Sequence, residues 1–85
     1  MKDLPKWFTN NGGTQYNKGG EVTNPFSGES AILNANELSM YDFIMGAQIV
    51  LEMGIMNNPK MVEDLRKGLD WFRKNNNEAY MVLLD

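Results

Sequence analysis

The most constraining feature of this sequence is a helical pattern over residues 35–56 that is apolar on two opposite sides. Because a helix turns by about 100° per residue, the apolar residues divide into two faces. The expected core face comprises Met40, Tyr41, Ile44, Ala47, Leu51 and Ile55, with Phe43 and Val50 at its edge. The second face comprises Leu38, Met45, Ile49, Met53 and Met56. A chain of 85 residues supplies about one covering layer. We therefore expect the second face to meet a β-hairpin, the C-terminal segment or another protein.

The residues at the start and inside of this helix predict how it begins and where it packs. Asn34 can cap the helix, and Glu37 stands three residues later, as in a capping box. Gly46 and Gly54 lie inside the expected helix, where each glycine destabilises by about 1 kcal/mol relative to alanine. We therefore predict that packing requires these glycines and that a neighbouring backbone approaches the helix there.

A second helix is predicted over residues 59–74, capped by Asn58 and with Pro59 in its first turn. Its apolar stripe comprises Met61, Val62, Leu65, Leu69 and Phe72. Three opposite-charge pairs stand four residues apart on its other side, namely Glu63 with Lys67, Arg66 with Asp70, and Asp70 with Lys74. The pattern predicts a core stripe opposite a solvated face, with a basic docking surface as the alternative.

Trp71 lies off the centre of that stripe, between Lys67 and Lys74, so that its ring can sit beneath either amine. Two interpretations stay open. In the first, Trp71 covers the rim of the core, against the N-terminal segment. In the second, it is an anchor for a partner protein, a role in which Trp is frequent.

The N-terminal segment, residues 1–20, is expected to be loop-like, because its Asn-Gly clusters are turn signals with no periodicity between them. Trp7, Phe8 and Tyr16 stand alone in this polar stretch. They either pin the segment to the core or form an exposed recognition arm.

Two further short segments complete the expected fold. Residues 21–33 predict a β-hairpin around an Asn-Pro-Phe-Ser-Gly turn in which Gly28 takes a positive φ. Residues 78–85 predict either a short helix capped by Asn77 or a strand that joins the hairpin. The chain is therefore expected to be one α+β domain: an N-terminal loop, a hairpin, two main helices and a short C-terminal helix or strand.

The composition excludes several kinds of chemistry. The chain contains no Cys and no His, so it lacks thiol nucleophiles, disulfides and the commonest general base and transition-metal ligand. Asp42 and Glu52 are about 15 Å apart along one helix, too far for a glycosidase-type pair. No calcium loop or phosphate-binding motif occurs. We expect no enzymatic activity, no cofactor, no metal and no small-molecule substrate.

The net charge of −3 is distributed unevenly. Residues 21–57 contain five acidic residues and no basic residue, whereas residues 58–77 contain five basic and three acidic residues. These two parts could attract each other within one copy or between copies. The basic excess is small for a nucleic-acid-binding protein, and no segment is apolar enough to predict a membrane span. The expected location is the cytoplasm, with a virus particle as the alternative.

The hairpin and the first helix contain the runs VTNPFSG (22–28) and ELSMYDFIMG (37–46), with Leu33 between them. The end of the chain contains GLDWFR (68–73) and AYMVLLD (79–85). These runs resemble small proteins encoded by marine tailed phages, and the resemblance covers most of the chain. It implies a bacteriophage protein. It brings no motif of known chemistry, so it assigns no activity to any residue.

The expected function is non-catalytic protein–protein interaction, as a phage accessory or virion-associated protein, because the helix over residues 35–56 has more apolar surface than so short a chain covers. The partner is another protein or a second copy in a homo-oligomer. The hypothesised partner-binding residues are Leu38, Met45, Ile49, Met53, Met56, Trp71, Lys67 and Lys74. The alternatives are a phage regulator that binds a host protein, and a nucleic-acid-associated protein that uses the basic face of the second helix.

Overall fold

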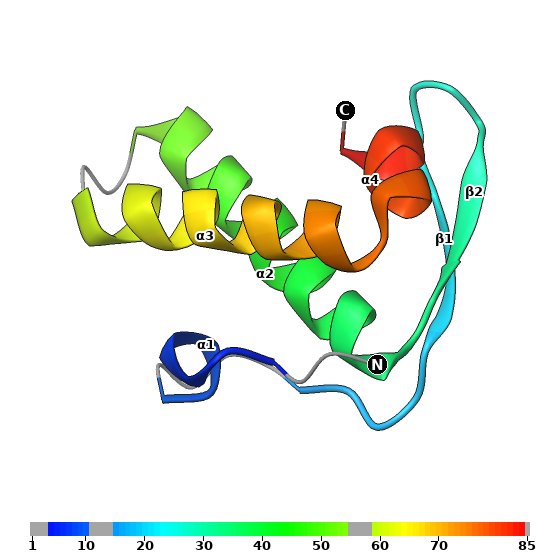
Figure 1. The fold of residues 1–85 in the computed structure, drawn as a ribbon. Helices are drawn as coiled ribbons and strands as arrows, with labels where there is room; N and C mark the ends of the chain where they lie inside the picture. The colour runs from blue at the N-terminus through cyan, green and yellow to red at the C-terminus, as the bar shows by residue number, and fades with distance from the viewer. Residues whose placement is uncertain (1–3, 11–14, 55–58, 85) are drawn as a thin grey trace.

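Two long helices, α2 (Ala35–Met53) and α3 (Pro59–Asn75), form the centre of the fold in a computed structural model that describes residues 4–10, 15–54 and 59–84. Helix α1 (Lys6–Asn10) and the hairpin strands β1 (Gly20–Thr23) and β2 (Ser30–Leu33) precede them, and helix α4 (Asn77–Leu83) follows. Figure 1 shows α2 crossing behind α3, with the hairpin standing beside α4. The expected α+β fold, a hairpin followed by helices, is confirmed. None of the described helices is long and apolar enough to span a lipid bilayer.

Helix α2 begins at the predicted capping box. The side chain of Asn34 accepts a hydrogen bond of 2.8 Å from the backbone N–H of Glu37. The Glu37 carboxylate in turn accepts one of 3.0 Å from the backbone N–H of Asn34. Two backbone donors that the helix start leaves unpaired are thereby satisfied, and the prediction is confirmed.

The end of α2 differs from the sequence prediction. The helix stops at Met53, and Gly54 forms its C-cap in the left-handed conformation, with φ of 67°. Glycine adopts this conformation without the steric cost of a Cβ. Gly54 therefore ends the helix rather than lying inside it, as was predicted. The last two positions of the expected helix, Ile55 and Met56, lie outside the described residues.

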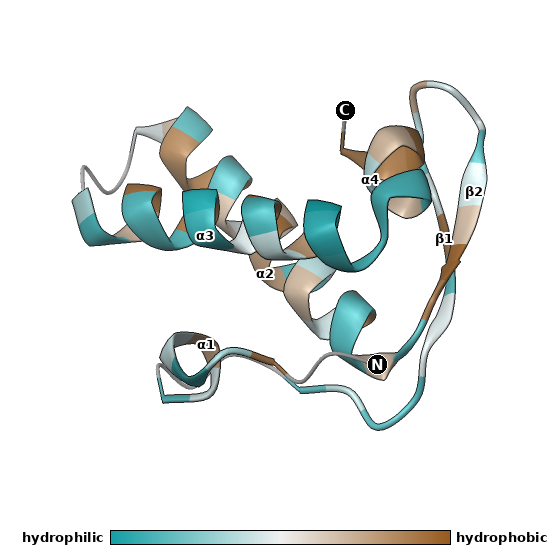
Figure 2. Ribbon diagram, viewed as in Figure 1, coloured by the Kyte–Doolittle hydropathy of each residue, from teal (hydrophilic) through white to brown (hydrophobic). Residues whose placement is uncertain are grey.

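Helix α3 packs on α2, but the residues that it buries do not follow the apolar stripe predicted from the sequence. The buried residues are Asp64, Gly68 and Phe72, spaced four apart. Leu65, Leu69 and Val62 lie about 60 to 120° round the helix from this line. Leu65 and Leu69 are half-buried, and Val62 is 41% exposed, so the prediction that Val62 belongs to the core was wrong. Figure 2 shows that α3 is mostly hydrophilic on the side turned away from α2.

Gly68 is the reason for this difference. A Cβ at Gly68 would lie 3.1 Å from the sulfur of Met40 and 3.4 Å from a side-chain carbon of Ile44, so the missing side chain lets α2 come close. At Gly46 and Gly54, by contrast, no described atom from another part of the chain lies within 4 Å of the position that a Cβ would take. The prediction that a neighbouring backbone approaches at those two positions was wrong for this chain taken alone.

The hairpin has the predicted strands and turn. Glu21 pairs with Ile32 and Val22 with Ala31 in an antiparallel register. Because side chains alternate between the faces of a sheet, Val22 and Ala31 turn toward the core and Ile32 toward solvent. In the turn, Gly28 has the predicted positive φ, at 77°.

The N-terminal segment contains one helical turn where a loop was expected. Helix α1 follows Pro5, whose carbonyl accepts the backbone N–H of Phe8 at 3.0 Å. Phe8 is buried, and its ring and that of Trp7 pack edge-on against Phe43 of α2. Both residues are therefore the predicted anchors. Tyr16 is not, because its ring is exposed and only its backbone N–H is tied down, to the Ser39 hydroxyl at 2.9 Å.

The C-terminal segment is a helix, as one of the two predictions had it. Asn76 caps α4 by accepting the backbone N–H of Ala79 at 3.2 Å, so the predicted cap, Asn77, is one residue too late. Ala79 and Leu83 of α4 are buried. The helix packs against β2 and α3, and it therefore covers the inner face of the hairpin.

A buried carboxylate joins the start of α2 to the junction between α3 and α4. Glu37 is 6% exposed. Its two oxygens accept hydrogen bonds from the side-chain amides of Asn75 at 2.7 Å and Asn76 at 3.2 Å. Together with the capping bond to Asn34, these contacts satisfy the carboxylate in place of water, which a buried charge requires.

Candidate protein-binding surface

An outward stripe runs along α2 on the side away from the core. It consists of Asp42, Gly46, Ile49 and Met53, a spacing that places all four on one side of a helix. All four are exposed, Ile49 by 53% and Met53 by 63%. The sequence predicted that this side of the helix is apolar. The described residues leave its C-terminal half exposed, at Ile49 and Met53.

The other residues of the predicted second face are placed differently. Leu38 packs against the core, so its expected place on a separate face was wrong. Met45 is half-buried, and Met56 lies outside the described residues. Of the five predicted apolar residues, Ile49 and Met53 are thus the two that form an exposed pair.

The charge on α2 restricts what this stripe can bind. The helix contains no Lys or Arg, and Asp42 and Glu52 are exposed on it. In an antiparallel pairing of two α2 helices centred on Ala47, Asp42 of one copy would stand opposite Glu52 of the other. Like charges brought close together repel each other. The stripe therefore fits a neutral or basic surface better than a second α2.

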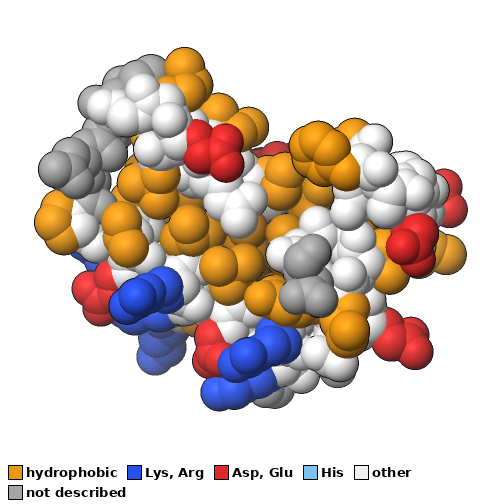
Figure 3. Space-filling model, turned by 90° about the horizontal axis from the view of Figure 1, so that it is seen from above, with side chains coloured by type: hydrophobic (Ala, Val, Ile, Leu, Met, Phe, Trp, Pro, Cys, Tyr) orange, Lys and Arg blue, Asp and Glu red, His pale blue; other side chains and the backbone are white. Residues whose placement is uncertain are grey.

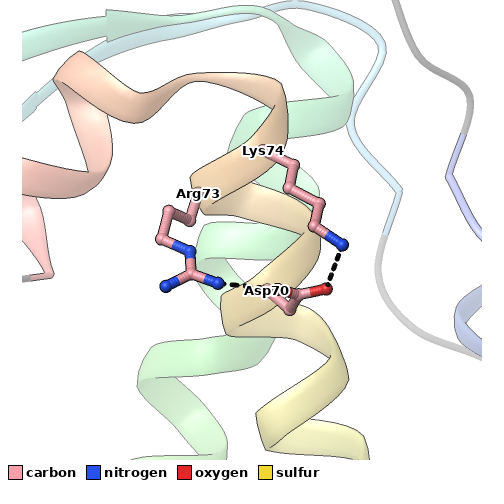
Figure 4. A network of polar contacts seen from close by, with 3 residues as sticks. All are labelled: Asp70, Arg73 and Lys74. Carbon is pink, nitrogen blue, oxygen red and sulfur yellow. Dashed lines mark hydrogen bonds and ion pairs between the residues drawn. The ribbon is translucent and has the colours of Figure 1, made fainter.

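The basic residues of α3 are largely engaged with acidic neighbours. Lys67 lies 3.3 Å from Glu63, and Lys74 lies 3.0 Å from Asp70, as predicted. The predicted pair of Arg66 with Asp70 was wrong, because Arg73 takes that place at 2.9 Å (Figure 4). These exposed pairs are typical of a solvated helix face and contribute little stability.

Trp71 does not stack beneath either lysine. It is half-buried and packs against the core. The amine of Lys67 lies instead over the ring of Trp7, 6.0 Å from its centre, and Lys74 binds Asp70. Of the two interpretations of Trp71, its placement favours the one in which it covers the rim of the core.

The pKa of Asp70 offers a direct test of the α3 network. Hydrogen bonds from Lys74 and then Arg73 hold the pKa of this carboxyl below its ordinary value. A lowered pKa means that the pairs persist above it and are lost as pH falls through it. We expect Lys74→Ala to raise the Asp70 pKa toward the ordinary value, and Arg73→Ala to raise it less, in an NMR titration of the carboxyl carbon. An unchanged pKa in both variants would contradict the network.

A small open pocket lies between α3 and α4. Its volume is about 270 Å³, and it is lined by Arg66, Leu69, Asp70, Arg73 and Tyr80. Among the described residues, no three acidic, Cys or His side chains are placed to hold a metal ion. The lining combines the apolar surface of Leu69 and Tyr80 with the guanidinium groups of Arg66 and Arg73 beside the Asp70 carboxylate, which suits an apolar group that carries an acidic neighbour.

One exposed residue was not singled out from the sequence. Phe26, at the tip of the hairpin, is 98% exposed. The sequence pattern around it predicts only a turn. The signal that could have found it is an aromatic residue placed between Pro25 and Ser27, where a tight turn leaves no room for a side chain to reach the core.

The uncovered position at Gly46 leads to a stability prediction. Because no atom lies near its missing Cβ, Gly46→Ala should raise the free energy of unfolding of the single chain by about 0.5 to 1 kcal/mol. Urea unfolding measures this change. Gly68→Ala is the matched control, since its Cβ would press on Met40, and we expect no comparable gain there. An equal gain at both positions would show that the packing contrast has no energetic effect.

No family model, curated protein or solved structure matches this chain. A functional proposal therefore depends on the exposed surfaces described above.

Proposed function

We propose that this chain is a non-catalytic protein-interaction module that binds through the outward stripe of α2. The observation that carries the proposal is the exposed pair Ile49 and Met53, one helical turn apart on the outer side of the longest helix. Apolar side chains of this size gain free energy when a partner removes them from water.

Two neighbouring features support the same surface. Gly46 lies one turn before Ile49, and no described residue fills the space above it. A glycine in an exposed helix interior destabilises the helix, and close approach of a partner backbone would offset that cost. Asp42 and Glu52 border the stripe, so the partner is expected to carry basic residues around an apolar centre.

The test replaces each exposed apolar residue by a charged one. We expect Ile49→Glu and Met53→Glu to abolish binding of a partner protein while the chain stays folded, because both side chains are already largely in water. Light scattering behind a sizing column measures the mass of the complex with the partner, and circular dichroism reports folding. Met81→Glu is the matched control, since Met81 is 58% exposed on α4.

The outcomes separate clearly. Unfolding by Ile49→Glu or Met53→Glu would mean that this side of α2 is internal and that the proposal is wrong. The partner is captured from a host lysate with the unchanged chain, and the same variants serve as controls. A partner that binds the Ile49→Glu variant as well as the unchanged chain would likewise contradict the proposed surface.

A phage accessory or virion-associated role stays the preferred setting for this module. Presence of the chain in purified virus particles would support it. Absence from particles would favour the alternative, a regulator that binds a host protein. The nucleic-acid alternative predicts binding that weakens steeply with salt and is lost when Lys67 and Lys74 are replaced by Glu.

A further inference from the structure

The tip of the hairpin holds Phe26 in a fixed position. The side chain of Asn24 accepts the backbone N–H of Phe26 at 2.9 Å and donates to the carbonyl of Val82 in α4 at 3.0 Å. The backbone of Asn24 also accepts the N–H of Gly28 at 2.8 Å and donates to Glu29 at 2.8 Å. The turn is therefore closed within itself and fastened to a helix.

This arrangement is unusual because a rigid turn exposes an aromatic ring almost completely. Nothing in the described chain shields Phe26, which is 98% exposed. Aromatic residues are frequent anchors of protein interfaces, and an anchor whose backbone is already ordered loses little backbone conformational entropy on binding. The tip thus has the properties of a ligand that fits into a pocket of a partner.

The pocket between α3 and α4 has a matching size. Since a cavity of roughly 150 Å³ holds a benzene ring, a pocket of about 270 Å³ has room for a phenyl side chain. Leu69 and Tyr80 supply apolar contact in its lining. The pocket is open to solvent, so a projecting side chain can enter without moving a helix.

The charges of the tip and the pocket are opposite. The hairpin contributes exposed Glu21 and Glu29 and contains no basic residue. At the pocket, Arg73 shares Asp70 with Lys74, whereas Arg66 forms no ion pair with any described residue. Figure 3 shows the Lys and Arg side chains gathered at the lower edge of the view, with acidic side chains beside them, and Asp and Glu side chains without basic neighbours at the right.

We propose that Phe26 of one copy inserts into the α3–α4 pocket of a second copy, with Glu29 placed to pair with Arg66. The tip and the pocket are different parts of the chain, so the contact is head-to-tail. Each copy keeps a free tip at one end and a free pocket at the other. Such contacts build a closed ring when the rotation from one copy to the next returns to the first copy. Otherwise they build an open chain of copies. This contact is independent of the outward stripe of α2.

The first experiment measures average mass against protein concentration by light scattering. We expect the mass of the unchanged chain to rise with concentration. Phe26→Ala and Arg66→Glu should each weaken this association about tenfold or more. Both side chains are exposed, so circular dichroism should show folded variants. Ile32→Ala, at a residue that is 78% exposed on the same hairpin, is the control and should associate normally.

The second experiment mixes two variants that are broken at opposite ends. Phe26→Ala keeps an intact pocket, and Arg66→Glu keeps an intact tip. Neither should associate alone, but their mixture should form a pair that grows no further, because one matching contact is available. A tip-to-tip or pocket-to-pocket interface would not be restored by mixing, and that result would overturn the proposal.

Two further outcomes decide between the surfaces. A chain that stays monomeric at every concentration would overturn the second-copy proposal and would leave the α2 proposal standing. Association that Ile49→Glu abolishes and Phe26→Ala leaves unchanged would assign self-association to α2 and would overturn the proposal for the tip. A combined Glu29→Arg and Arg66→Glu variant should recover association if the two side chains pair.

Discussion

Replacing Phe72 by alanine is expected to lower the free energy of unfolding by about 3 to 5 kcal/mol. Phe72 is fully buried, with 0% of its surface exposed, and belongs to the cluster that joins the three longest helices to the hairpin. Its ring lies 6.5 Å from that of Tyr41 in α2. Removing the ring loses its burial and leaves a cavity that the surrounding backbone fills only in part.

The size of this loss matters because small domains have little stability to spare. A net stability of about 5 to 15 kcal/mol is usual, so Phe72→Ala should leave the chain largely unfolded at elevated temperature. Thermal and urea unfolding followed by circular dichroism measure the change. Val62→Ala is the control on the same helix, since Val62 is partly exposed, and its effect should be small. A loss below about 1 kcal/mol for Phe72→Ala would contradict the buried position.

Replacing Glu37 by alanine is expected to destabilise the chain by about 2 to 4 kcal/mol. Its carboxylate is the acceptor for the amides of Asn75 and Asn76 and for the backbone N–H of Asn34. Without it, these part-buried donors lose their partner, and each unsatisfied group destabilises the folded state. The connection between α2 and the α3–α4 junction should weaken most.

A conservative variant separates the charge of Glu37 from its size. Gln at this position keeps one carbonyl oxygen but presents an NH₂ group where the second carboxylate oxygen accepted a hydrogen bond. We therefore expect Glu37→Gln to destabilise the chain, but less than Glu37→Ala, in the same urea measurement. Hydrogen exchange should show faster exchange at Ala79, whose N–H depends on Asn76. Equal stability in all three proteins would contradict the role of the carboxylate.

Features set by neighbouring residues could be predicted from the sequence. The capping box of Asn34 and Glu37 lies within four positions, and the positive φ of Gly28 follows from its place in a tight turn. Such local geometry depends on few atoms outside the segment. The hairpin and the existence of the two long helices were predictable for the same reason.

Features set by packing between segments could not be predicted in this way. Periodicity located the apolar stripe of α3, but the close contact at Gly68 turned a different line of the helix toward α2. The stacking of Lys67 on Trp7 depends on where the N-terminal segment lies, which its own turn signals do not encode. Likewise, Asn76 rather than Asn77 caps α4, because three successive Asn residues offer equivalent caps.

The tie between Asn24 and the carbonyl of Val82 connects residues that are 58 positions apart. Closing so long a loop has a larger entropy cost than pairing the two neighbouring strands, because the cost grows with the length of the loop. The hairpin strands pair locally, but the tip gains its last restraint only when α4 has docked. The backbone order of the tip that carries Phe26 thus depends on the docking of α4. A chain in which α4 has not docked would hold the tip by the hydrogen bonds of the turn alone.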